Sequence, residues 1–147
     1  MNKFLQFIKS LLLVKEIISK NGVVYFRRYR LLQTPWFGIY VHQILKSDQE
    51  RHPHDHPFSY SSLILSGAYH EDVWYSPDFK KRLSQSYYQG DVVEHSKLDF
   101  HKISLLTKEV WTLVFASGRT RTWGYLLKDG SWIDHKEYRK LKNDGKL

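Results

Sequence analysis

The stretch Arg51-His52-Pro53-His54-Asp55-His56-Pro57 decides how the rest of this sequence is interpreted. In an extended strand, residues two apart share a face, so His54 and His56 are expected to project into the same space, as two ligands of one ion must. Neutral imidazole is a common ligand of zinc, iron, nickel and copper. A His-x-His pair also occurs on exposed strand faces without a ligand role. The sequence downstream decides between a metal site and such an exposed pair.

The composition limits the chain to one domain and removes cysteine chemistry. With 147 residues, of which 41% are hydrophobic and 16% aromatic, the chain can build one core of substantial size but not two. The absence of cysteine excludes disulfides, thiolate metal ligands and thiol nucleophiles. It also fits a reducing compartment, so we expect a cytoplasmic protein with one metal site made of nitrogen and oxygen ligands.

Residues 1–22 are predicted to form an N-terminal amphipathic helix. Between Met1 and Lys20, apolar residues recur at three- and four-residue spacing and are interrupted by lysines, and Asn21-Gly22 is a helix stop signal. The uninterrupted apolar run is too short for a transmembrane span. We expect a lid packed across a sheet, with an interfacial membrane helix as the alternative.

From Val23 onward the sequence is typical of an all-β domain. Short runs of aromatic and β-branched residues alternate with turn residues such as Ser66-Gly67 and Asp129-Gly130. The predicted strands are 23–29, 38–45, 59–65, 68–75, 84–89, 91–95, 101–105, 110–116 and 120–127. Many short strands with close turns predict a sandwich or small barrel over residues 23–135. Residues 136–147 form a basic C-terminal tail, in which 136–142 have a second helical pattern.

Two glycines and a third histidine follow at matching distances. Gly67 lies eleven residues beyond His56, and His101 lies eleven residues beyond Gly90. Together with His54, this arrangement resembles the two-motif pattern of the cupin superfamily. The resemblance implies an all-β, cupin-like double-stranded β-helix, a jelly-roll barrel, preceded here by the N-terminal α-helix. It also implies that His54, His56 and His101 bind one divalent transition metal, with iron as the first choice and zinc, nickel or manganese as alternatives.

The sequence departs from the family pattern at Tyr60, which stands four residues after His56, where cupins usually have a glutamate. Three neutral imidazoles leave the full charge on a divalent ion, so its open positions should favour an anionic or bidentate oxygen ligand. The thiol dioxygenases are similar in using three histidines around iron. Tyr60 is therefore a candidate catalytic residue that donates a hydrogen bond to oxygen or substrate, or else a side chain that packs against the barrel wall.

His42 is a second candidate catalytic residue. Tyr40, His42 and Ile44 share one face of a predicted strand, so His42 is expected inside the barrel as a general base, a partner that orients a metal ligand, or a core histidine. His95 lies near the end of the second motif, where a ligand role would compete with His101.

The segment 118–125 carries the candidate substrate-binding residues. Arg119, Arg121 and Trp123 alternate along a predicted strand, where a guanidinium and an indole could hold a carboxylate, a phosphate or a base. We assign this role to Arg121 and Trp123, and place Arg119 with the solvent. With the His-Asp-His-Pro run, this aromatic segment resembles cupin-like proteins of bacteria and their phages.

The net charge of +8 and the pI of about 9.6 predict an anionic partner. The motifs favour a metal-dependent enzyme of dioxygenase or isomerase type that acts on a small anionic substrate, and homodimers are common among cupins. Basic clusters with interleaved aromatic residues leave an alternative, a non-catalytic module that binds nucleotides or nucleic acid. No recognised helix-turn-helix or RNA-binding motif accompanies them.

Overall fold

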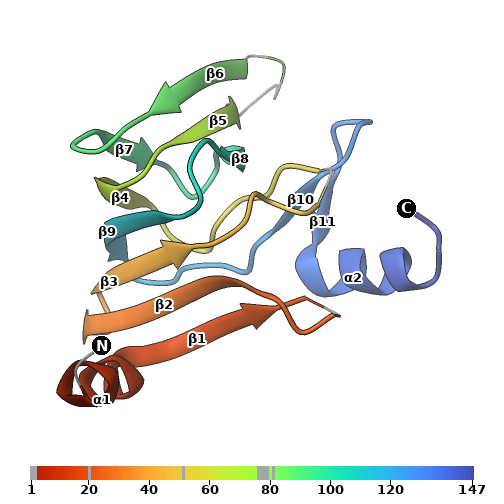
Figure 1. The fold of residues 1–147 in the computed structure, drawn as a ribbon. Coiled ribbons are helices and arrows are strands. Elements are labelled where there is room, and N and C mark those ends of the chain that lie inside the picture. The colour runs from red at the N-terminus through yellow and green to blue at the C-terminus, as the bar shows by residue number, and fades with distance from the viewer. Residues whose placement is uncertain (1–2, 20, 51, 76–79, 81) are drawn as a thin grey trace.

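The computed structural model describes residues 3–19, 21–50, 52–75, 80 and 82–147, about half of which lie in antiparallel strands (Figure 1). The elements in chain order are α1 (Lys3–Leu12), β1 (Leu13–Ile18), β2 (Val24–Gln33), β3 (Phe37–Ile44), β4 (Tyr60–Ser66), β5 (Tyr69–Trp74), β6 (Arg82–Tyr87), β7 (Val92–His95), β8 (Phe100–Leu105), β9 (Val110–Ser117), β10 (Gly124–Leu126), β11 (Trp132–Asp134) and α2 (His135–Asn143). A six-stranded sheet has the order β1-β2-β3-β9-β4-β7, a three-stranded sheet the order β6-β5-β8, and β10 pairs with β11.

The core lies between the larger sheet and the three-stranded sheet. Burial alternates along β5 and along most of β9, so that every second side chain points inward, as the period of a strand requires. One apolar cluster joins strands of both sheets through Ile64, Tyr69, Val93 and Val110. The predicted all-β jelly-roll architecture is therefore confirmed.

The prediction of one helix over residues 1–22 is wrong in its length. Helix α1 ends at Leu12, and residues 13–18 form β1, an edge strand paired antiparallel with β2. Glu16 lies opposite Arg27, and its carboxylate accepts a 2.7 Å hydrogen bond from the guanidinium. Pairing with β2 and the β-branched residues of this segment outweigh its helical periodicity. Among the described residues, no helix has the length and apolar character needed to cross a membrane.

The C-terminal part differs from the prediction in two ways: one predicted strand is much shorter, and one strand was not predicted. Residues 118–123 form no strand, so the expectation that Arg119, Arg121 and Trp123 alternate on one strand face is wrong. The predicted strand 120–127 shrinks to β10, which pairs with the unpredicted β11. The helical pattern at 136–142 is confirmed by α2, whose first turn is capped by the side chain of Asp134.

Asp55 ties the histidine-rich segment to the C-terminal hairpin. Its side chain is fully buried and accepts hydrogen bonds from the backbone N–H of Gly124 at 2.7 Å, from Arg121 Nη1 at 2.7 Å and from Trp132 Nε1 at 3.1 Å. Each donor would lose its partner if the carboxylate were removed, and a buried unpaired polar group is costly. Asp55 therefore fixes the segment between the two metal-ligand candidates.

We predict that Asp55→Ala lowers the free energy of unfolding by about 3 kcal/mol, since it breaks a largely buried ion pair. Urea denaturation of the purified protein followed by circular dichroism measures the change. Asp129→Ala, at an exposed turn, is the matched control and should behave like the parent. Equal midpoints for the parent and Asp55→Ala would contradict the anchoring role.

Candidate metal centre

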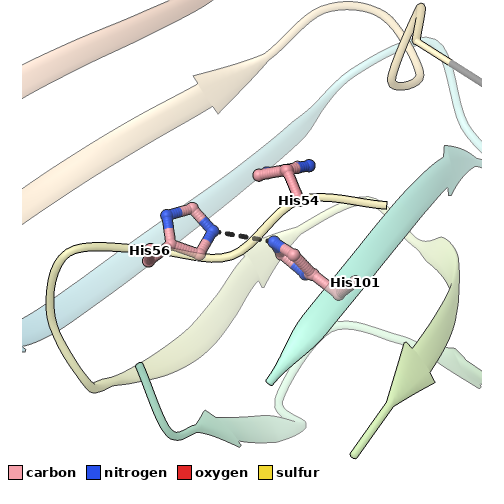
Figure 2. A group of neighbouring side chains, drawn as sticks. All are labelled: His54, His56 and His101. Carbon is pink, nitrogen blue, oxygen red and sulfur yellow. Dashed lines mark hydrogen bonds between the residues drawn. The ribbon is translucent and has the colours of Figure 1, made fainter. Parts of the chain in front are cut away.

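His54 and His101 are brought together by the backbone. Their segments form a two-way bridge, in which His54 N–H donates to His101 C=O at 3.0 Å and His101 N–H donates to His54 C=O at 2.9 Å. The centroids of the two rings lie 4.6 Å apart, and the ring of His56 lies 5.0 Å from that of His54 (Figure 2). One nitrogen of each ring lies within 4.8 Å of those of the other two, which is close enough for one ion.

Glu71 orients the imidazole of His101 by binding the ring nitrogen that points away from His54 and His56. Its Oε1 accepts a 2.5 Å hydrogen bond from His101 Nδ1, and both side chains are buried. Nε2 of the same ring points to His56 Nε2 at 2.8 Å, as Figure 2 shows. A carboxylate on one ring nitrogen fixes the tautomer and the orientation of a metal-binding histidine, so His101 is presented through Nε2.

The protonation states follow from burial and from this carboxylate. Burial lowers the pKa of His54 to about 4, and burial with the charge of His101 holds the pKa of His56 well below its usual value. Burial disfavours protonated His101 too, but the hydrogen bond and charge of Glu71 outweigh it and raise its pKa. Burial would raise the pKa of Glu71, but hydrogen bonds from His101 and His95 lower it to about 2. His101 is thus the one of the three imidazoles whose protonated form is favoured by its surroundings.

A second group of ligand types lies behind the first and shares His101 with it. Glu71, His95 and His101 have ligand atoms within 4.8 Å of one another, all in buried side chains. His95 Nε2 donates to the same Oε1 of Glu71 at 2.9 Å. The hydrogen bonds that Glu71 accepts from both rings explain why the three side chains lie together without an ion. We therefore interpret Glu71 and His95 as residues that orient His101.

The three imidazoles line a cavity of about 210 Å³ whose charged walls are mostly basic. Four cationic side chains line it, namely Lys15, Arg28, Lys46 and Arg119, against a single carboxylate, Asp48, among the described residues. Asp48 Oδ2 lies 3.9 Å from His54 Nδ1 and accepts a hydrogen bond from the backbone of Ile103. A space of this size with these walls suits a small anion.

The two residues predicted as catalytic both line this cavity. The ring of Tyr60 lies 5.1 Å from that of His56, and burial with the charge of Glu71 keeps its pKa well above 10, so its hydroxyl stays protonated. His42 Nε2 accepts a 2.9 Å hydrogen bond from Arg28 Nε. Burial and the charge of Arg28 hold the pKa of His42 far below 6.5, so this imidazole is neutral.

Of the two residues predicted to bind substrate, the structure places one at the cavity. Trp123 lines it, with its ring 6.0 Å from that of His54. Arg121 is absent from the lining and is engaged by Asp55 and by the backbone C=O of Lys97. Arg119, which we placed with the solvent, is exposed but also lines the cavity.

Sequence reasoning missed Glu71, Asp48 and the inward direction of Arg28. Glu71 carried a signal, because it stands between Tyr69 and Val73 in an alternating strand, where an acid on the apolar face needs a partner. Arg28 belongs to the basic run Arg27-Arg28-Tyr29-Arg30, whose sequence does not show which of these side chains points inward. Nothing in the local pattern marks Asp48.

The three ligand candidates fit a divalent transition metal by their chemistry. Three imidazoles from two segments converge, two of them are kept neutral by burial, and the third is oriented by a carboxylate. Zinc and iron accept nitrogen sets of this kind and leave further positions for a substrate.

No family model matches the chain, and no curated protein matches it in sequence. Solved structures do match. KdgF from Halomonas sp. is 14% identical with a TM-score of 0.53, over 72% of this chain and 87% of that one. A putative mannose-6-phosphate isomerase from Ralstonia eutropha is 11% identical with a TM-score of 0.54, over 63% of this chain and 84% of that one.

An Fe(II) form of HppE is 16% identical with a TM-score of 0.55, over 70% of this chain and 54% of that one. The chain thus matches about half the length of HppE. At these identities the likeness concerns the fold, and these neighbours are cupin-fold proteins. The chain has the cupin fold that its two histidine motifs predicted.

Proposed function

We propose that this protein is a metal-dependent enzyme that acts on a small anionic substrate. The observation that carries the proposal is the convergence of His54, His56 and His101 on the wall of a small cavity whose charged lining residues are mostly cations. Metal sites that catalyse reactions keep positions open to a cavity, whereas structural sites are closed by protein ligands. Iron remains the first candidate, supported by the Fe(II) form of HppE among the similar structures.

The residues around the proposed centre would bind and orient the substrate. A metal held by the three histidines would supply Lewis acidity to a substrate oxygen or, as iron, redox chemistry of the dioxygenase type. Tyr60 keeps its proton and would donate a hydrogen bond to a developing negative charge. The neutral imidazole of His42 is held by Arg28, so its role would be to position that guanidinium.

The alternative of a nucleic-acid module has less support from the described residues. Several cations of the basic clusters are paired: Arg27 with Glu16, Arg82 with Asp72, Arg121 with Asp55, and Lys142 with Glu50. Arg28 faces the cavity and not an outer surface. Pairing of this kind leaves fewer charges for phosphate contacts along a strand of nucleic acid.

We predict that the protein, purified without an affinity tag, contains about one equivalent of transition metal, as one three-histidine site requires. The His54→Ala/His101→Ala double variant should contain none, and elemental analysis measures both. His70→Ala is the matched control: His70 lies on β5, is hydrogen-bonded to Ser86 of β6, and its loss should leave the metal in place. A parent protein that stays empty when offered iron, zinc, nickel and manganese would refute the proposal.

We also predict that metal affinity rises as the pH is raised above 6.5, because the metal competes with a proton on His101, whose pKa is raised from its usual value. Glu71→Gln removes the charge that raises this pKa, so its affinity should vary less over the same range. At pH 8 it should bind zinc about 10- to 100-fold more weakly, as expected for loss of the carboxylate behind a ligand.

Zinc titration against a competing chelator measures both effects. Glu94→Gln, an exposed carboxylate on β7 that contacts Ser61, is the control and should follow the parent. The same pH dependence in Glu71→Gln and the parent would show that Glu71 does not set the protonation of His101.

A further inference from the structure

Arg28 is a cation at the cavity wall whose guanidinium is held by neutral and aromatic side chains. Its Nε donates to His42, and its guanidinium carbon lies 5.0 Å from the ring of Tyr40 and 5.9 Å from that of Phe58. Among the described residues it forms no ion pair, and burial, together with the charge of Arg119, lowers its pKa. A desolvated guanidinium with free N–H groups lacks the counter-charge that normally accompanies it.

Two more cations converge on the same place. Lys15 reaches the cavity from β1, and Arg119 reaches it from the loop after β9. The side chain of Lys15 is partly exposed, yet desolvation and the charges of Arg28 and Arg119 lower its pKa. Three mutually repelling cations around one space favour a ligand with more than one negative charge.

Phe58 lies between the cation cluster and the candidate metal centre, because its ring is close to both Arg28 and His56. The guanidinium carbon of Arg28 lies 5.9 Å from the ring of Phe58, and the same ring stacks on that of His56 at 5.8 Å. One small molecule can therefore contact both the cations and the proposed metal. Its two ends would need different groups, a multiply charged anion at Arg28 and oxygen donors at the histidines.

We propose that Lys15, Arg28 and Arg119 form a subsite for a phosphoryl group, so that the substrate is a small phosphate ester or phosphonate with a metal-binding oxygen at its other end. This inference rests on the proposed function and names its substrate class. A dianionic tetrahedral group can accept from the guanidinium and the ammonium at once, whereas a carboxylate offers one charge to three cations.

Calorimetric titration with inorganic phosphate at pH 8 and fixed ionic strength tests the subsite. We expect binding by the parent and also by the metal-free His54→Ala/His101→Ala variant, because the cations do not depend on the metal. Arg28→Gln should weaken phosphate binding by about tenfold or more, as the loss of a charge-assisted contact requires. Acetate should bind more weakly than phosphate, since it carries one charge.

Two further variants separate local binding from misfolding. Arg27→Gln, the neighbouring arginine paired with Glu16, should bind phosphate like the parent. Lys15→Gln, on an edge strand, should weaken binding by a smaller factor than Arg28→Gln. Equal phosphate binding by Arg28→Gln and the parent, or equal binding of acetate and phosphate, would overturn the subsite.

Metal analysis of the same samples keeps this inference apart from the proposed function. Arg28→Gln should retain the metal content of the parent, because Arg28 contacts none of the three ligand candidates. A metal-loaded parent that binds no phosphate would refute the phosphoryl subsite alone. Phosphate binding by the parent that disappears in the metal-free double variant would also refute it, since the anion would then bind the metal.

Discussion

The pair of backbone hydrogen bonds between His54 and His101 is the constraint on which the candidate metal centre depends. It joins the irregular segment after β3 to β8 of the smaller sheet, so that imidazoles from distant parts of the chain meet. Asp55, between the two motif histidines, points away from them and anchors the same segment to β10 and β11. Successive residues thus serve opposite purposes: His54 and His56 face the candidate metal centre, and Asp55 between them fixes the segment in place.

Electrostatics divides the interior into two parts. Behind the histidines, Glu71 is stabilised as a carboxylate by His95 and His101, and in turn it favours the proton on His101. In front of them, the cavity is lined by cations with Asp48 as the one carboxylate among the described lining residues. A buried charge persists when a partner compensates it, and among the described residues no carboxylate forms an ion pair with Lys15, Arg28 or Arg119 at the cavity.

Much of the fold followed from the strand patterns and turns, since β-branched alternation and glycine turns are local properties. Helix α2 and all predicted strands except 120–127 appear with shifted ends. The prediction of a long N-terminal helix was wrong because residues 13–18 form a strand by pairing with β2, and a local sequence pattern does not reveal that pairing. The assignment of Arg121 to the substrate depended on a strand that does not form, and Asp55 holds that arginine instead.

The sequence by itself determined the cupin-like fold and which histidines are the candidate metal ligands, because residue type and short spacing can be read from the sequence directly. Tertiary structure decided which polar groups became partners. Arg28 and His42 are 14 residues apart, Glu71 and His101 are 30 apart, and Asp55 and Arg121 are 66 apart. A single strand does not reveal which face is buried or what lies across it, so the partners of these charges are decided when the strands pair and the connecting segments pack against them.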